Sequence, residues 1–223
     1  MKVLIVDDHP LVRDAMSRIM VELAAEVQVL QAADGERGLK LSRSEPELDL
    51  LLLDLNLPGT HGFDLLAAFR REHPALPVVV VSMFHDGDTV REVIRRGAMG
   101  FIPKVCSKEV ILGALRLVLS GAIYLPPEAI ADGIANAGGA AASPSPGRTA
   151  KSFSELGLTP RQGEVLALLM RGCSNKVICR DLGLAERTVK LHVTAVLNVL
   201  QVSSRTQAVI AASRLGLSAD MLR

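Results

Sequence analysis

Two kinds of hydrophobic pattern alternate along the first half of the chain. Short and nearly continuous apolar runs occupy residues 3–6, 27–30, 50–53, 78–81 and 99–102. Between and after them, apolar residues recur with the spacing of one helix face, at residues 11–23, 35–41, 63–69, 90–97 and 108–119. Apolar runs of this length predict strands that are buried on both faces. Their alternation with helices predicts a doubly wound α/β domain with a five-stranded parallel sheet and right-handed crossovers.

The pattern of the last third of the chain is helical throughout. Thr159 and Pro160 provide an N-cap and a first-turn proline, and Gln162 stands at the capping-box position of the same helix. A second helix runs through Val177 and Ile178 to Gly183, a third covers about residues 185–200, and a fourth covers about residues 204–215. The second and third helices are joined by residues 181–184, which include a turn glycine. This predicts a small all-α helix-turn-helix domain.

Residues 137–152 separate the two patterns, and they are small, polar and interrupted by prolines. Such a segment has no apolar residues to bury and is typical of a flexible linker. We therefore predict an α/β domain over residues 1–122, a linker over residues 123–153, and the helical domain over residues 154–223. A short helix is expected at residues 129–135 within the linker.

Charge differs between the two predicted domains. Residues 1–130 carry 14 basic and 18 acidic side chains, whereas residues 151–223 carry 10 and 5. An acidic unit joined to a basic unit is typical of a cation-binding or signalling domain attached to a domain that binds a polyanion. The three cysteines show no metal-ligand spacing, which predicts free buried thiols in a reducing compartment. No signal peptide or membrane span is recognised, so we expect a cytoplasmic location.

Polar residues follow four of the predicted strands. The third strand runs into Asp54, and Pro58 and Gly59 then turn the chain away. A doubly wound sheet gathers the carboxyl ends of strands one, three, four and five at one edge, which brings together Asp7, Asp8, Asp54, Ser82 and Lys104. Crowded carboxylates suit Mg²⁺, and a carboxylate beside a lysine and a hydroxyl suits phosphoryl transfer. Taken singly, the aspartates could be helix caps, Ser82 a loop cap and Lys104 a solvated surface residue.

These residues, in this order and spacing, resemble the receiver domain of bacterial two-component response regulators, which has a flavodoxin-like fold. Residues 158–161, 174–176 and 188–192 resemble the LuxR-type helix-turn-helix of the NarL/FixJ subfamily. The resemblance implies that Asp54 accepts a phosphoryl group from a histidine kinase. It implies Mg²⁺ binding by Asp8, Asp54 and the Asn56 backbone carbonyl, and by Asp7 through water. It also implies that Lys104 contacts the phosphoryl group and that Ser82 and Phe101 form a switch.

A helical wheel of the third C-terminal helix predicts its DNA-contacting face. The outward positions, which suit readout in a major groove, are Arg187, Lys190, Leu191, Thr194 and Asn198. Cations near the helix ends are expected to approach phosphates, namely Lys176, Arg180, Arg161 and Arg205. Thr194 and Asn198 stand where many relatives are basic. We therefore expect weak binding by a monomer and a shallow dependence on salt.

The sequence thus predicts a transcription regulator in which phosphorylation of Asp54 controls dimerisation and sequence-specific binding to duplex DNA. Its expected partners are a cognate histidine kinase, duplex DNA and a second copy of the chain, with Mg²⁺ as cofactor and no membrane. The only catalysis expected is its own phosphoryl transfer and autodephosphorylation. Two alternatives remain open. An aspartyl-phosphate phosphatase would also use a strand-end aspartate, although Asn56 stands where such enzymes carry a second acid. The helical domain could instead bind another protein.

Overall fold

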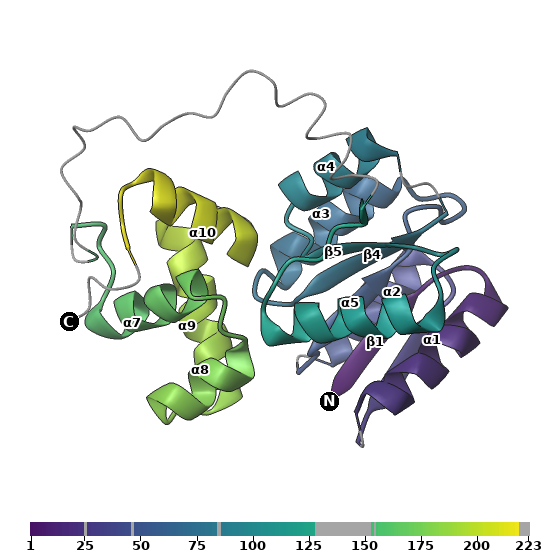
Figure 1. Cartoon of the computed structure of the whole chain (residues 1–223), viewed down its shortest axis with the longest axis horizontal. Coiled ribbons are helices and arrows are strands. Elements are labelled where there is room, and N and C mark those ends of the chain that lie inside the picture. Colours follow the sequence, from purple (N-terminus) through teal and green to yellow (C-terminus); the bar gives the residue numbers. More distant parts are fainter. Residues whose placement is uncertain (25, 46, 84–85, 128–152, 154, 219–223) are drawn as a thin grey trace.

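A computed structural model describes residues 1–24, 26–45, 47–83, 86–127, 153 and 155–218. The α/β domain contains one five-stranded sheet, in which every neighbouring pair of strands is parallel and the order is β2-β1-β3-β4-β5 (Figure 1). The strands are β1 (Lys2–Val6), β2 (Gln28–Ala32), β3 (Leu50–Leu53), β4 (Val78–Ser82) and β5 (Gly100–Pro103). The helices are α1 (Pro10–Leu23), α2 (Gly35–Ser44), α3 (Gly62–Glu72), α4 (Gly87–Arg95) and α5 (Lys108–Ser120). The predicted α/β architecture is confirmed.

Alternate residues of the central strands pack on opposite faces of the sheet. Val3 and Ile5 of β1 join the core formed with α1 and α5, whereas Leu4 and Val6 join the core formed with α2 and α3. α4 covers the β4–β5 end of this second face, where Val80 and Phe101 pack against it. Because helices cover both faces, a strand interior without polar residues is stable here, which explains the continuous apolar runs of the sequence.

The C-terminal domain is built from α7 (Pro160–Met170), α8 (Asn175–Leu182), α9 (Glu186–Val199) and α10 (Arg205–Arg214). Thr159 and Gln162 form the predicted capping box, in which each side chain bonds the backbone of the other residue. Gly183 ends α8 with a φ of 63°, a conformation that favours glycine and turns the chain into α9. Val189, Val193, Val196 and Leu197 are the buried face of α9. The predicted helix-turn-helix is confirmed, whereas the helix expected at 129–135 lies outside the described residues.

Candidate functional site: an acidic cluster and a candidate DNA-contacting helix

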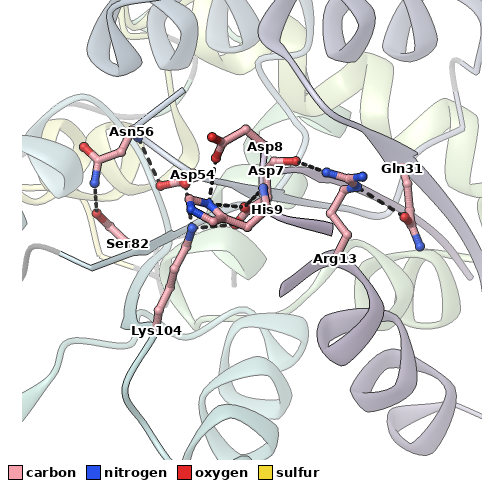
Figure 2. A network of polar contacts seen from close by, with 9 residues as sticks. All are labelled: Asp7, Asp8, His9, Arg13, Gln31, Asp54, Asn56, Ser82 and Lys104. Carbon is pink, nitrogen blue, oxygen red and sulfur yellow. Dashed lines mark hydrogen bonds and ion pairs between the residues drawn. The ribbon is translucent and has the colours of Figure 1, made fainter. Parts of the chain in front are cut away.

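Four polar side chains meet at the carboxyl edge of the sheet, as the strand pattern predicted (Figure 2). Asp7 follows β1, Asp54 follows β3, Ser82 is the last residue of β4, and Lys104 follows β5. Asp7, Asp54 and Ser82 are each no more than 2% exposed. Because each residue stands at or just beyond the end of a parallel strand, the rigid sheet fixes its position.

Lys104 lies between two carboxylates. Its Nζ is 2.7 Å from Oδ2 of Asp7 and 2.6 Å from Oδ2 of Asp54, and its side chain is only 5% exposed. Burial alone would lower the pKa of this ammonium group, but the hydrogen bonds to Asp54 and Asp7 outweigh burial and raise the pKa above its ordinary value. Lys104 therefore stays charged, and it places a fixed positive charge beside Asp54.

Asp8 and His9 complete the acidic cluster. One potential ligand atom each from Asp7, Asp8, His9 and Asp54 lies within 4.8 Å of all the others. Nδ1 of His9 comes to 2.8 Å from Oδ1 of Asp8, yet this buried oxygen accepts no properly oriented hydrogen bond from the described residues. An unsatisfied carboxylate oxygen among other carboxylates fits a divalent cation of the hard, oxygen-binding kind.

The residues around Asp54 shape the space in front of it. The backbone N–H of Asn56 donates to Oδ1 of Asp54 at 3.0 Å, and Nδ2 of Asn56 donates to Oγ of Ser82 at 3.4 Å. Both Asn56 and Ser82 line a cavity of ≈ 430 Å³ between the end of β3, the start of α3 and the start of α4. Phe101 is fully buried against Val80, Val90 and Val93. Its ring therefore belongs to the core under α4.

His9 was not among the site residues predicted from the sequence. His9 precedes α1, its side chain is 62% exposed, and its ring approaches both Asp7 and Asp8. Nothing in its spacing marked it, since it forms no histidine pair. Its position directly after two aspartates at a strand end was the available signal. The cysteines also differ slightly from expectation, because all three are free but only partly buried.

The outward face of α9 divides into an exposed part and a covered part. Arg187, Leu191 and Asn198 are exposed, with Leu191 64% accessible. Thr194 is half-buried and donates from its Oγ1 to the carbonyl of Lys190. Lys190 itself is only 20% exposed because it contacts the α/β domain. The exposed part retains three of the five residues that the wheel predicted for DNA readout.

The flanking cations also differ in accessibility. Lys176 and Arg180 are exposed. Arg161 instead pairs with Glu164 at 2.5 Å, and it donates to the carbonyl of Leu182. Nη2 of Arg205 donates to the carbonyl of Cys173 at 2.5 Å, and burial lowers the pKa of this guanidinium to about 10. The contact of Arg205 with a phosphate is thus not available in this arrangement, because its guanidinium is turned into the protein.

Two family models match the two domains. The response regulator receiver domain model matches residues 3–116, and the model of bacterial regulatory proteins of the luxR family matches residues 156–212. The chain belongs to the LuxR-type response regulators. The predicted family is thereby confirmed, together with its role as a transcription regulator rather than an enzyme. The phosphatase alternative falls with this assignment.

Curated relatives are similar along their whole length. The regulator is 38% identical to the glycerol metabolism activator of Pseudomonas putida over 229 residues, which cover 100% of this chain and 99% of the relative. It is 33% identical to the nitrate/nitrite response regulator protein NarL of Escherichia coli K12, with 93% of each chain covered. A solved LuxR family DNA-binding response regulator from Silicibacter pomeroyi is 31% identical with a TM-score of 0.51, and the match covers 57% of this chain and 98% of that one.

The DNA-binding domain of the regulator rests on the receiver domain at the amino-terminal edge of the sheet. Nζ of Lys190 donates to the carbonyl of Leu48 at 3.0 Å and lies 3.8 Å from Asp49, just before β3 begins. On the same helix, Glu186 lies 3.3 Å from Lys190. The pKa of Glu186 is raised, mainly by burial and also by a hydrogen bond with Asp49. The positive charge of Lys190 lowers this pKa, but by less.

Two glycines allow a close approach elsewhere in this contact. A Cβ on Gly121 would lie 2.2 Å from the carbonyl oxygen of Gly172, and a Cβ on Gly97 would lie 2.4 Å from Cβ of Ser204. Nε2 of Gln207 also donates to the carbonyl of Arg95 at 2.7 Å. The two domains therefore meet through backbone as well as side chains.

Within the described parts of the chain, every helix is too short or too polar to cross a membrane.

Proposed function

We propose that a histidine kinase phosphorylates the regulator on Asp54. The observation that carries this proposal is the placement of the Asp54 carboxylate between Lys104, at 2.6 Å, and the Asn56 and Ser82 pair. A carboxylate oxygen of Asp54 attacks the phosphorus of a phosphohistidine, and the phosphorus–nitrogen bond breaks as the acyl phosphate forms. The Lys104 ammonium then faces the transferred phosphoryl oxygens, and Ser82 supplies a hydroxyl to another of them.

The acidic cluster is proposed as a Mg²⁺ site. Asp8, Asp54 and the Asn56 carbonyl would hold the ion directly, and Asp7 would hold it through water. The bound ion supplies charge neutralisation for the phosphoryl group. Support comes from Asp8, whose buried Oδ1 accepts no properly oriented hydrogen bond from the described residues although Nδ1 of His9 lies 2.8 Å away, and from the approach of the four ligand-bearing side chains. His9 lies at the rim of this cluster and would compete with the cation when protonated.

Replacing Asp8 with asparagine should remove most of the stabilisation that Mg²⁺ gives to the regulator. A ligand present at a hundred times its dissociation constant stabilises the folded state by about 2.7 kcal/mol. The measurement is the thermal midpoint with and without MgCl₂. Asp88→Asn is a matched control, because this aspartate side chain is 93% exposed on α4. An equal Mg²⁺-dependent shift in wild type and Asp8→Asn would contradict the assignment of Asp8.

The arrangement of the domains supports a mechanism in which DNA binding is controlled by release of the DNA-binding domain from the receiver domain. Lys190 belongs to the predicted DNA-contacting face, yet it bonds the Leu48 carbonyl of the receiver domain. A recognition helix held in this way cannot place Lys190 in a groove of DNA. Phosphorylation would therefore shift an existing equilibrium from this closed arrangement toward an open one, which forms a dimer and reads two half-sites. The domain ranges 1–122, 123–153 and 154–223 are proposed as the units of this motion.

The experiment that tests this function uses beryllofluoride, which mimics an acyl phosphate. Solution mass and binding to promoter-containing duplex DNA would be measured with and without Mg²⁺ plus beryllofluoride. We expect a rise in both mass and DNA affinity for the wild-type chain and neither change for Asp54→Ala. A protein that never shifts duplex DNA under either condition would instead support the alternative output, binding to another protein.

The closed arrangement should weaken as the pH rises from acidic to neutral. Glu186 interacts with Asp49 of the receiver domain, with Lys190 on its own helix and with Cys179 on α8, and Glu47 lines the same cavity. Burial and the hydrogen bond with Asp49 raise its pKa in the docked state, so docking favours the protonated form of Glu186. Docking is then strongest below the ordinary pKa of 4.5 and is lost progressively as the pH passes through the raised value.

The measurement is an interdomain distance, by energy transfer between labels on the two domains, across an acid-to-neutral titration. Glu186→Gln removes the titrating group, so we expect a smaller change in closed population over this range. Glu164→Gln is the control, because Glu164 lies on α7 and pairs within its own domain. An identical titration curve for Glu186→Gln and wild type would show that Glu186 does not cause the dependence.

A further inference from the structure

A cavity rich in arginine lies between the two domains. It has a volume of ≈ 640 Å³ and is bounded by α3 and α4 of the receiver domain and by the α9–α10 corner of the DNA-binding domain. Its charged lining residues are one glutamate and four arginines, namely Glu92, Arg70, Arg71, Arg95 and Arg96. A single carboxylate cannot balance four guanidinium groups, so this arginine cavity carries an excess of positive charge.

The single carboxylate is shared by two arginines, and a third arginine makes no hydrogen bond or ion pair with the described residues. Glu92 accepts from Nε of Arg95 at 2.8 Å and from Nε of Arg96 at 2.5 Å. The exposed guanidinium of Arg71 makes no hydrogen bond or ion pair with any residue that the structure describes. No residue in the described part of the chain occupies its donors, so they can contact a ligand. A planar guanidinium with free donors matches the geometry of phosphate oxygens.

Arg70 adds a second and independent indication. The residue is only 3% exposed, and its terminal nitrogens donate to the carbonyls of Pro74 and Leu76. Its Nε is buried and has no hydrogen-bond partner among the described residues. A buried guanidinium without a counter-charge is unfavourable, because neutral carbonyls replace only part of its lost hydration. An anion in the adjoining cavity would supply the missing charge.

The remaining lining residues indicate the size and chemistry of the ligand. Ser203, Asn198 and Gln207 contribute neutral polar groups, and the amino-terminal end of α10, which adds a partial positive charge, lies beside Ser203. The lining residues include no aromatic ring among those described, so there is no surface on which a nucleobase could stack. The cavity thus suits a compact polyanion better than a nucleotide or a peptide.

We propose that the arginine cavity binds a small phosphate- or pyrophosphate-bearing anion that bridges the two domains. The inference rests on the closed arrangement put forward in the proposed function. Because both domains form the walls, the ligand binds the closed form more tightly than the open form and stabilises it. By reciprocity, release of the DNA-binding domain lowers the affinity for the anion to the same extent. The anion would thus oppose binding to DNA.

The test is calorimetric titration of the full-length chain with inorganic pyrophosphate, without Mg²⁺ and at constant ionic strength. Arg71→Ala/Arg95→Ala removes two exposed side chains that line the cavity. We expect its affinity to fall about tenfold or more, since each lost charge-assisted hydrogen bond weakens binding. The control is Arg91→Ala on the same face of the domain, because Arg91 is exposed on α4 but lies outside this cavity. Equal affinities in all three proteins, or no saturable binding, would overturn the site.

Gly121→Ala separates the two parts of the inference, because it is designed to part the domains without changing any of the four arginines that line the cavity. Weaker pyrophosphate binding in this variant supports a ligand that bridges both domains, and unchanged binding overturns the bridging role. The beryllofluoride experiment contains no pyrophosphate. If it succeeds while pyrophosphate fails to bind, the arginine cavity alone is refuted and the proposed function stands.

Discussion

Replacing Asp54 with asparagine is expected to abolish phosphorylation of the regulator. The amide has no carboxylate oxygen to attack phosphorus, and it leaves Lys104 with Asp7 as its single charged partner among the described residues. The measurement is intact mass after incubation with a small-molecule phosphodonor and Mg²⁺. We expect the gain of one phosphoryl group in the wild-type chain and complete loss of that gain in Asp54→Asn.

The matched control for this prediction is Asp64→Asn. Asp64 is an exposed aspartate in the first turn of α3, and it lies outside the acidic cluster. This variant should gain the phosphoryl group as wild type does. Phosphorylation of Asp54→Asn at wild-type level would mean that another residue is the acceptor, and the roles proposed for Lys104 and Ser82 would fall with it.

Gly121→Ala should open the closed arrangement and raise DNA affinity without phosphorylation. The added Cβ would lie 2.2 Å from the backbone carbonyl oxygen of Gly172, and a backbone atom cannot move aside as a side-chain end can. Separation of the domains relieves this overlap. Since coupling between sites is typically worth about 5-fold to 150-fold in affinity, we expect a gain of about tenfold in binding to duplex DNA.

Gly59→Ala provides the control for backbone strain. Gly121 and Gly59 both have positive φ, at 103° and 73°, so alanine is strained at either position, but no described residue lies within 4 Å of a Cβ on Gly59. Only Gly121→Ala should expand the molecule in small-angle scattering. A compact Gly121→Ala protein with unchanged DNA affinity would show that the domain contact does not limit binding to DNA.

The position of the acidic site could be predicted from the sequence because the sheet fixes where its residues lie. Once a strand is identified, its last residue and the residue after it are known, and parallel strands bring these positions to one edge. For this reason, Nζ of Lys104 lies 2.6 Å from Oδ2 of Asp54 although the two residues are 50 positions apart in the sequence. The sequence did not predict His9 as a site residue, because its approach to Asp8 depends on the direction of one side chain just before α1.

Contacts between the domains could not be predicted from the sequence. A periodic pattern shows which face of a helix is apolar, but it does not show which part of the other domain contacts a polar face. Lys190 and Arg187 look equivalent on a helical wheel, but only Lys190 meets the Leu48 carbonyl. Arg70 is a similar case. A charged residue near the end of α3 suggests a solvated surface, whereas the structure leaves it 3% exposed beside the DNA-binding domain.

Strand β3 has the two sites of the regulator at its two ends. Leu48 and Asp49 precede the strand and hold Lys190, whereas Asp54 follows it at the opposite edge of the sheet. The docked domain therefore lies at the edge of the sheet opposite Asp54, so under the proposed function a kinase would reach Asp54 without displacing the docked domain. Under the proposed function, we therefore expect phosphoryl transfer to act on the closed molecule and to shift its equilibrium toward the open one.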